Sequence, residues 1–267
     1  MAIDLGGTLT KIAYVTAAGD ITDVQRVETR LDERGAVPPA WLAGLIKGAA
    51  QARADLTTVG YGFVAPGIID ARVGVVRVAP NIGWRDVPIR DLLDAQTGMS
   101  GAIGHDVRAG GLAEWRLGAH PHVDNLLFLP LGTGIAGAAI VDGRLLEAGG
   151  FAGEIGHLHV SVADQHCACG AYGCLETIAS AAGVARSYRH TTGFRRSALE
   201  VAELARHGDQ AALQAFAVAI AGLAEALAAY AALLAPEVVI IGGGLSGAAD
   251  LIMDELAEAL DDRLSFH

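Results

Sequence analysis

The stretch Asp4-Leu5-Gly6-Gly7-Thr8-Leu9-Thr10-Lys11 joins two apolar, β-rich runs near the start of the chain, residues 2–4 and 11–15. This pattern predicts a strand, a glycine turn and a second strand. Glycines let backbone N–H groups approach a phosphate, threonine hydroxyls can donate to it, and a carboxylate at the strand end can hold Mg²⁺ through water. An ordinary hairpin turn is the alternative. The predicted phosphate-site residues are Asp4, Gly6, Gly7, Thr8 and Lys11.

The second half of the chain repeats this order. A buried strand at residues 126–129 precedes the turn Gly132-Thr133-Gly134 and a further strand at 138–141. Two such units predict a duplicated α/β fold with a cleft between the copies, so that two turns could hold one polyphosphate. A third group, Gly242-Gly243-Gly244, follows the buried run 238–241 and could lie against a nucleoside. Taken alone it is weak evidence, because many strand-to-helix turns are rich in glycine.

Further elements follow from the spacing of apolar residues. A long alanine-rich helical pattern ends before Pro236-Glu237, which stops it ahead of the last buried strand. The other predicted strands are residues 58–64, 73–78 and 102–103, and the predicted helical stretches are 39–54, 109–117 and 198–234.

Composition narrows the classes of partner. The chain has 267 residues, of which 52% are hydrophobic, and a formal net charge of -11. That charge disfavours nucleic acid or an acidic membrane as partner, because both are polyanions. The apolar runs 125–131 and 238–241 are too short to span a bilayer, and the N-terminus lacks the layout of a signal peptide. A cytoplasmic protein is expected.

All three cysteines lie between positions 167 and 174, which suits a metal site better than a disulfide framework. One histidine and three cysteines would complete a closed tetrahedral zinc shell of the structural type. His157 is the favoured histidine, with His159 and His166 as competing candidates and three buried free thiols as the alternative. The predicted metal ligands are His157, Cys167, Cys169 and Cys174.

Carboxylates at two places suggest sugar chemistry. Asp106, at the end of a predicted strand, could accept a proton from a sugar hydroxyl as that oxygen attacks a phosphate, or could be only a helix N-cap. Glu154, His157 and Glu176 are polar groups of the kind that bind sugar hydroxyls, and a metal site would hold their backbone in place. Surface ion pairing is the alternative for the two glutamates.

Together these motifs resemble the ROK family of sugar kinases, within the actin-like, hexokinase-like ATPases, along nearly the whole chain. The resemblance implies two actin-like (ribonuclease H-like) α/β domains, here residues 1–118 and 119–267. It implies that residues 4–11 and 131–137 are phosphate loops, that 238–246 is the adenosine motif, and that Asp106 is the catalytic base. It places Asn81, His105, Asp106, Glu154, His157 and Glu176 at the sugar, with Pro66-Gly67 nearby, and the Cys/His set on zinc.

Three positions depart from the family pattern. His105 stands where the family usually has Asn, and imidazole is bulkier and titrates near neutrality. Ala136 and Ala138 stand where glycines are common in the second phosphate loop. The chain ends at His267, where relatives usually continue through another helix, so a missing C-terminal helix is expected.

The resemblance implies ATP-dependent phosphorylation of a hexose, with Mg²⁺ and a structural Zn²⁺. Glucose is the first choice by family frequency, and mannose, fructose and N-acetylated amino sugars stay open. Repressors of the family carry an N-terminal winged helix, for which the position of Asp4 leaves no room. A sugar-binding regulator without turnover is the remaining alternative. Family resemblance and the apolar helical second half also suggest a homodimer.

Overall fold

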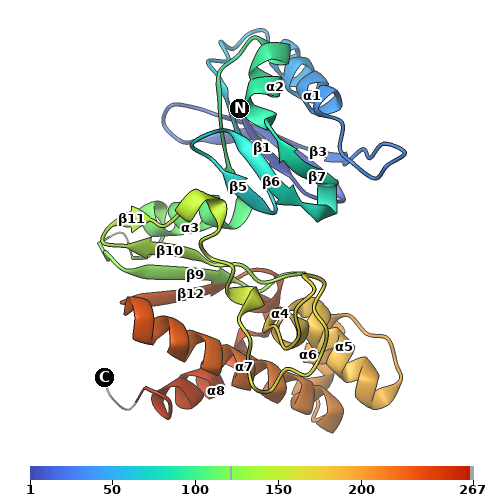
Figure 1. Ribbon diagram of the computed structural model, residues 1–267, viewed down its shortest axis with the longest axis vertical. Coiled ribbons are helices and arrows are strands. Elements are labelled where there is room, and N and C mark those ends of the chain that lie inside the picture. The colour runs from blue at the N-terminus through green and yellow to red at the C-terminus, as the bar shows by residue number, and fades with distance from the viewer. Residues whose placement is uncertain (121, 265–267) are drawn as a thin grey trace. The chain divides into compact units, whose positions relative to one another are not determined.

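The computed structural model describes residues 1–120 and 122–264, which form two compact units (Figure 1). Unit 1 comprises Met1–Ala109 and Glu147–Phe151, and the other described residues form unit 2. The division falls within helix α3 (Asp106–Leu117), between Ala109 and Gly110. The boundary predicted after residue 118 stays a prediction.

Unit 1 contains a five-stranded and a three-stranded sheet. In the larger sheet, β1 pairs antiparallel with β2 and parallel with β4, and β4 pairs parallel with β8. A core that includes Leu5, Ile46 and Phe63 lies between this sheet and the helices. The larger sheet has the order β3 (Ile21–Glu28), β2 (Leu9–Val15), β1 (Ala2–Leu5), β4 (Tyr61–Ala65), β8 (Gly101–His105), and the smaller sheet β5 (Ile68–Asp70), β6 (Val75–Ala79), β7 (Trp84–Val87). The helices are α1 (Pro39–Ala52), α2 (Ile89–Thr97), η1 (Pro80–Ile82) and η2 (Ala148–Gly150).

Unit 2 repeats the strand order of unit 1. Strand β9 pairs antiparallel with β10 and parallel with β12, as β1 does with β2 and β4. Helices α7 and α8 lie side by side and share one core with Leu127 and Leu129 of β9 (Figure 1). The sheet has the order β11 (Arg144–Leu145), β10 (Ala138–Val141), β9 (Leu126–Pro130), β12 (Val238–Gly242). The helices are η3 (Ile155–His157), α4 (Glu176–Ala179), α5 (Ala181–Thr192), α6 (Ala198–Arg206), α7 (Gln210–Leu234), η4 (Gly244–Ala248) and α8 (Ala249–Asp261).

The strand order β3-β2-β1-β4 thus recurs as β11-β10-β9-β12, and the predicted duplication is confirmed. Both predicted hairpins form, and the β9–β10 hairpin ends with the strand predicted at 138–141. The cleft expected between the copies stays a prediction.

The helical pattern at 198–234 is broken in the structure, where it was predicted to be continuous. Helix α6 ends at Arg206, and Gly208 adopts a positive φ of 84° that other residues rarely accept. Asp209 then caps α7, since its carboxylate accepts a hydrogen bond from Ala212 N at 2.9 Å. The Gly-Asp pair is therefore the physical reason for two helices.

Other boundaries also shift. The strand predicted at 58–64 begins only at Tyr61. The strand predicted at 73–78 begins at Val75, after a turn in which Gly74 has a φ of 79°. Helix α3 begins at Asp106 rather than at Ala109. The edge strand β3 was not predicted, because nearly all of its residues are exposed and it lacks an apolar alternation.

Helix α7 is the one helix in the described residues that is long and apolar enough to cross a membrane by length and composition. The core helix of a soluble domain passes the same test. One side of α7 packs into the core of unit 2 through residues that include Phe216, Leu223 and Leu227.

Buried Arg108 attaches the segment 147–151 to unit 1. Its guanidinium donates to Gly150 O at 3.1 Å and to Ile69 O of β5 at 3.2 Å, and Arg108 is only 4% exposed. A Cβ on Gly150 would lie 2.3 Å from Ile69 O, so this approach requires glycine.

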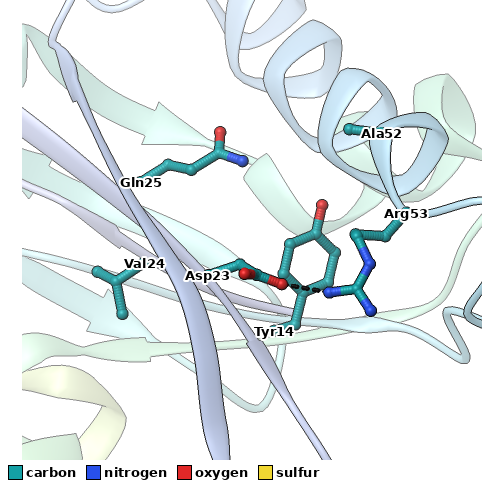
Figure 2. A pocket seen from close by; sticks show the side chains of 6 residues that line it. All are labelled: Tyr14, Asp23, Val24, Gln25, Ala52 and Arg53. Carbon is teal, nitrogen blue, oxygen red and sulfur yellow. Dashed lines mark hydrogen bonds and ion pairs between the residues drawn. The ribbon is translucent and has the colours of Figure 1, made fainter.

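A surface pocket of unit 1 lies between β2, β3 and the end of α1 (Figure 2). Arg53 stacks over the Tyr14 ring at 5.5 Å from the centroid and forms ion pairs with Asp23 and Asp55. Because two carboxylates already neutralise Arg53, the pocket has no spare cation for an anionic ligand. None of the predicted site residues lines it.

Candidate functional site

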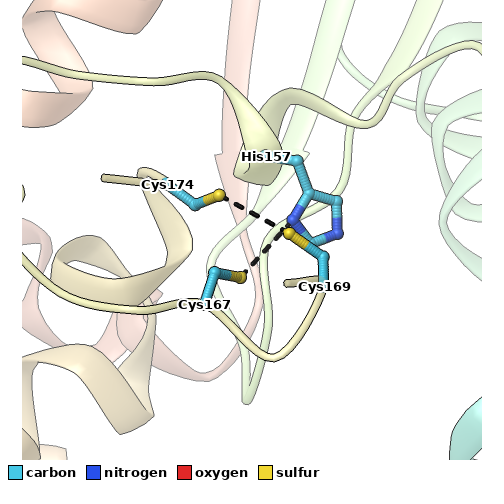
Figure 3. A group of neighbouring side chains, drawn as sticks. All are labelled: His157, Cys167, Cys169 and Cys174. Carbon is cyan, nitrogen blue, oxygen red and sulfur yellow. Dashed lines mark hydrogen bonds between the residues drawn. The ribbon is translucent and has the colours of Figure 1, made fainter. Parts of the chain in front are cut away.

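The four predicted metal ligands converge in unit 2 (Figure 3). The ligand atoms of His157, Cys167, Cys169 and Cys174 all lie within 4.8 Å of one another. Cys167 Sγ is 3.7 Å from His157 Nδ1, and Cys169 Sγ is 3.7 Å from Cys174 Sγ. Zn–S bonds of about 2.3 Å at tetrahedral angles separate two sulfurs by about 3.8 Å. The cluster therefore has the dimensions of a closed tetrahedral zinc shell.

Tight turns bring the cysteines together. Cys167 N donates to Ala171 O at 2.8 Å and Gly170 N donates to Cys167 O at 3.0 Å, which closes a turn around Cys169. Gly170 and Gly173 both have positive φ, 94° and 77°, which explains the glycines in this segment.

The competing histidines lie elsewhere. The ring of His166 packs edge-on against Tyr172 with 5.2 Å between centroids. His159 lies beside Gly173, where an added Cβ would be 2.7 Å from the imidazole. Within the described residues, neither joins the cluster.

The surroundings shift the pKa values of two of the thiols in opposite directions. Burial raises the pKa of Cys174 to about 12, whereas a backbone hydrogen bond at Ala171 lowers the pKa of the more exposed Cys169. Metal binding must therefore displace a proton from Cys174 at neutral pH. On the other side of the His157 ring, Nε2 lies 3.8 Å from Glu154 Oε2, so this carboxylate could orient the ring.

In unit 1 the first glycine turn lies against Asn81. A Cβ on Gly7 would be 3.2 Å from Asn81 O, so the backbones approach closely. Gly6 N donates to Leu9 O at 3.1 Å, and Asp4 and Lys11 form a cross-strand ion pair at 3.0 Å. The structure thus brings the predicted phosphate turn and one predicted sugar-side residue together.

Thr29, which the sequence did not single out, holds this turn from the end of β3. Its N–H donates to Thr8 O at 2.9 Å and its hydroxyl donates to Gly6 O at 2.7 Å. A hydroxyl has one proton, so the 2.9 Å contact with buried Thr10 Oγ1 must be donated by Thr10. An isolated threonine after an exposed strand carries no sequence signal for such a role.

His105 and Asp106 lie where β8 passes into α3. Val107 N donates to Asp106 Oδ1 at 2.7 Å and to His105 Nδ1 at 3.1 Å. The hydrogen-bond network therefore assigns the proton of a neutral imidazole to Nε2. Burial lowers the pKa of His105, Arg108 lowers it further and Asp106 opposes the shift, so the ring is neutral at neutral pH. The Asp106 side chain stays 37% exposed.

In unit 2 the second and third glycine groups meet at Leu131. Leu131 N donates to Gly242 O at 2.9 Å, and Leu131 O accepts from Leu245 N at 3.0 Å. Gly243 has φ of 80°, and a Cβ there would lie 2.6 Å from Leu131 O. Glu176 also reaches the loop 131–137, accepting a hydrogen bond from Ile135 N at 2.8 Å.

The predicted site residues are divided between the two units. Unit 1 carries the first phosphate turn, Asn81, His105 and Asp106. Unit 2 carries the other glycine groups, the Cys/His cluster, Glu154 and Glu176. Their roles as substrate contacts stay predictions.

The duplicated hairpin order and the glycine turns define an actin-like α/β protein. The ROK family model matches residues 1–265, and the chain belongs to the ROK family.

Individual relatives agree with this assignment. A glucokinase of Halalkalibacterium halodurans is 34% identical over 97% of this chain and 84% of its own length. A glucokinase of Thermotoga maritima is 32% identical over 98% of this chain and 87% of its own length. The crystal structure of a ROK family glucokinase from Streptomyces griseus in complex with glucose and AMPPNP has a TM-score of 0.80 at 27% identity, with 98% and 88% covered. Other matching relatives are named as xylose repressors or kinases of N-acetylated amino sugars.

We expect the Cys/His cluster to bind one Zn²⁺ per chain, with an affinity that rises with pH because protons compete for the thiolates. His157→Asn should weaken zinc binding more than about 100-fold. Loss of a residue that only hydrogen-bonds a metal ligand typically costs about 10- to 100-fold, and this substitution removes a ligand itself. Competition with a chromophoric chelator at several pH values measures this. His166→Asn is the matched control, and an equal loss in that variant would contradict the assignment.

We expect the protein to lose stability as pH falls through about 6.5, the ordinary pKa of histidine. The lowered pKa of buried His105 means that the unfolded state binds more protons, so the free energy of unfolding rises with pH in this range. In His105→Asn the free energy of unfolding, measured with urea, should fall less between pH 8 and pH 5 than in the wild type. Identical pH profiles for the two proteins would refute the role of His105.

Thr29→Val should lower the free energy of unfolding by about 1–3 kcal/mol, because Gly6 O and the buried Thr10 hydroxyl lose a partner. Thr29→Ser should recover most of this loss. Urea unfolding would compare both with Thr22→Val, which alters an exposed threonine on the preceding strand β3. If Thr29→Val lowered the free energy of unfolding no more than Thr22→Val, the hydrogen bonds of the Thr29 side chain would contribute nothing to stability.

Proposed function

We propose that the protein is an ATP-dependent sugar kinase that transfers the γ-phosphoryl group to the primary hydroxyl of a hexose, with glucose favoured. The observation that carries this proposal is Asp106, a partly exposed carboxylate at the end of β8. Glucokinase relatives at 34% and 32% identity over nearly the whole chain support the activity and the substrate.

The proposed reaction is an in-line transfer. Asp106 accepts the proton of the sugar hydroxyl as its oxygen forms a bond to the γ-phosphorus and the bond to the ADP oxygen breaks. The hydrogen bond from Val107 N fixes one oxygen of the carboxylate. Asp106 is the first residue of helix α3, directly after the last residue of β8.

Backbone N–H groups of the two glycine turns would hold the phosphates. Thr8 and Thr133 are both exposed at these turns, so their hydroxyls can reach a ligand. Asp4 would hold Mg²⁺ through water, and Mg²⁺ when bound supplies positive charge at the phosphates. Gly242, Gly243 and Gly244 would lie against the nucleoside.

On the sugar side, Asn81, His105, Glu154, His157 and Glu176 are the proposed contacts. A neutral His105 presents an N–H donor at Nε2, where the usual Asn of the family presents an amide. This supports hexose binding and leaves mannose, fructose and N-acetylated amino sugars as alternatives. The Cys/His cluster would hold a structural Zn²⁺ that orders the segment carrying Glu154 and Glu176. We further propose a cytoplasmic homodimer with domains at 1–118 and 119–267.

Asp106→Asn should abolish ATP-dependent turnover while leaving glucose affinity within about threefold, because the amide keeps the size of the side chain but accepts no proton. Coupled ADP release and calorimetric glucose binding measure the two quantities. Glu114 is an exposed carboxylate on the same helix, so Glu114→Gln is the matched control and should keep both turnover and glucose affinity. Equal loss of binding and turnover in Asp106→Asn would indicate a structural role.

A sugar-binding regulator without turnover is the second candidate, favoured only by His105 beside the catalytic position. ADP release measured with a panel of hexoses and N-acetylated amino sugars distinguishes the two functions. Saturable sugar binding with no ADP release for any sugar would refute the kinase.

A further inference from the structure

Glu176 contacts the second glycine loop directly. It is the first residue of α4, and its Oε2 accepts a hydrogen bond from Ile135 N at 2.8 Å. Ile135 is 3% exposed, so this N–H has little access to water. Without the carboxylate, a buried donor in the loop 131–137 would lose its partner.

Gly134 provides the space for this carboxylate. A Cβ at Gly134 would lie 2.5 Å from Glu176 Oε2, too close for any real contact. The φ of Gly134 is not in the left-handed region, so the backbone itself would accept alanine. A methyl group at this position would therefore displace the Glu176 carboxylate rather than strain the turn.

Helix α4 begins two residues after Cys174, a member of the Cys/His cluster. Cys174 O accepts hydrogen bonds from Thr177 N at 3.0 Å and from Thr177 Oγ1 at 2.7 Å. Both Cys174 and Thr177 are nearly fully buried, at 1% and 3% exposed. The position of Cys174 therefore determines where the Glu176 side chain begins.

The segment after α4 holds the same loop at a second point. Ala181 N donates to Gly132 O at 2.8 Å, and the preceding Ser180 caps α5 by accepting from Gly183 N at 3.0 Å. The loop 131–137 is thus attached to residues 174–181 at both Gly132 and Ile135.

We propose that Glu176 is a positioning residue for the loop 131–137 and couples the metal occupancy of the Cys/His cluster to nucleotide binding. This rests on the proposed function, in which the loop holds phosphates. The metal ligand Cys174 sets the start of α4, Glu176 fixes the Ile135 amide, and Gly132, Thr133 and Gly134 are thereby held ready for the nucleotide. The bond needs an acceptor oxygen rather than a charge, so glutamine supports it.

A double-mutant cycle on ADP affinity tests the contact, with full-length protein, Mg²⁺ and no sugar. Glu176→Ala should weaken ADP binding about tenfold, and Glu176→Gln should keep it within about twofold. Gly134→Ala should mimic Glu176→Ala, because the added methyl group displaces the carboxylate. The double variant should bind ADP no more weakly than either single variant, since both remove the same contact.

Glu225→Ala is the matched control. The Glu225 carboxylate also accepts a backbone hydrogen bond, from Ser161 N at 2.9 Å, and a bond from Ser161 Oγ at 2.6 Å, but it has no contact with the loop among the described residues. Glu225→Ala should keep wild-type ADP affinity. A tenfold loss in this variant as well would mean that ADP binding responds to any such truncation, and would overturn the proposal.

The metal dependence has a readout separate from activity. Hydrogen–deuterium exchange of peptides that cover residues 131–137 should accelerate when Zn²⁺ is removed with a chelator, and adding Zn²⁺ should restore protection. In Glu176→Ala the same peptides should already exchange fast and should respond little to the metal. Unchanged exchange on metal removal from a zinc-loaded wild type would overturn the coupling.

The outcomes separate this inference from the proposed function. If the wild type binds ADP and glucose but Glu176→Ala loses only glucose affinity, Glu176 is a sugar contact and the positioning role is refuted while the kinase stands. If the wild type binds no ADP, the proposed function itself fails and the inference fails with it.

Discussion

The backbone junction at Leu131 is the constraint on which unit 2 depends. Strand β9 pairs in parallel with β12, and the pairing continues past the strand ends, where Leu131 N bonds to Gly242 O and Leu245 N bonds to Leu131 O. Two glycine-rich turns therefore leave the sheet side by side. A Cβ on Gly243 would strike Leu131 O, so this approach is open only to glycine. In unit 1 the hairpin β1–β2 lies beside the parallel strand β4 in the same way.

Glycine turns need support from elsewhere in the chain. Glycine loses more conformational freedom on folding than other residues, so a glycine-rich turn has little intrinsic preference for one shape. In unit 1 the support is Thr29, whose hydroxyl and N–H bond the turn at Gly6 and Thr8. In unit 2 it is the carboxylate of Glu176 at Ile135. Each turn is thus shaped by one polar side chain distant in sequence.

The junction of β8 and α3 combines two opposite environments in adjacent residues. His105 is buried and neutral, whereas Asp106 is partly exposed at the positive end of a helix. His105 Nδ1 lies 3.2 Å from Asp106 Oδ1, and the lowered pKa of the buried ring keeps this neighbour of the proposed base uncharged near neutral pH. Arg108, two residues further, lies buried against Ile69 and Gly150 and ties the returning segment to unit 1.

Short local patterns of glycines, cysteines and alternating apolar residues were enough to predict the duplicated hairpin fold, the glycine turns and the three cysteines of the Cys/His cluster. The sequence favoured His157 but left His159 and His166 as competing ligands, since spacing does not show which ring turns toward the thiols; the structure confirms His157. The sequence did not reveal Thr29, the Glu176–Ile135 contact or the break at Gly208. The first two are hydrogen bonds between residues far apart in the chain, and the third depends on one glycine and one cap inside an otherwise helical pattern. These features are visible in the folded protein alone, because such contacts arise when the strands and helices have already packed.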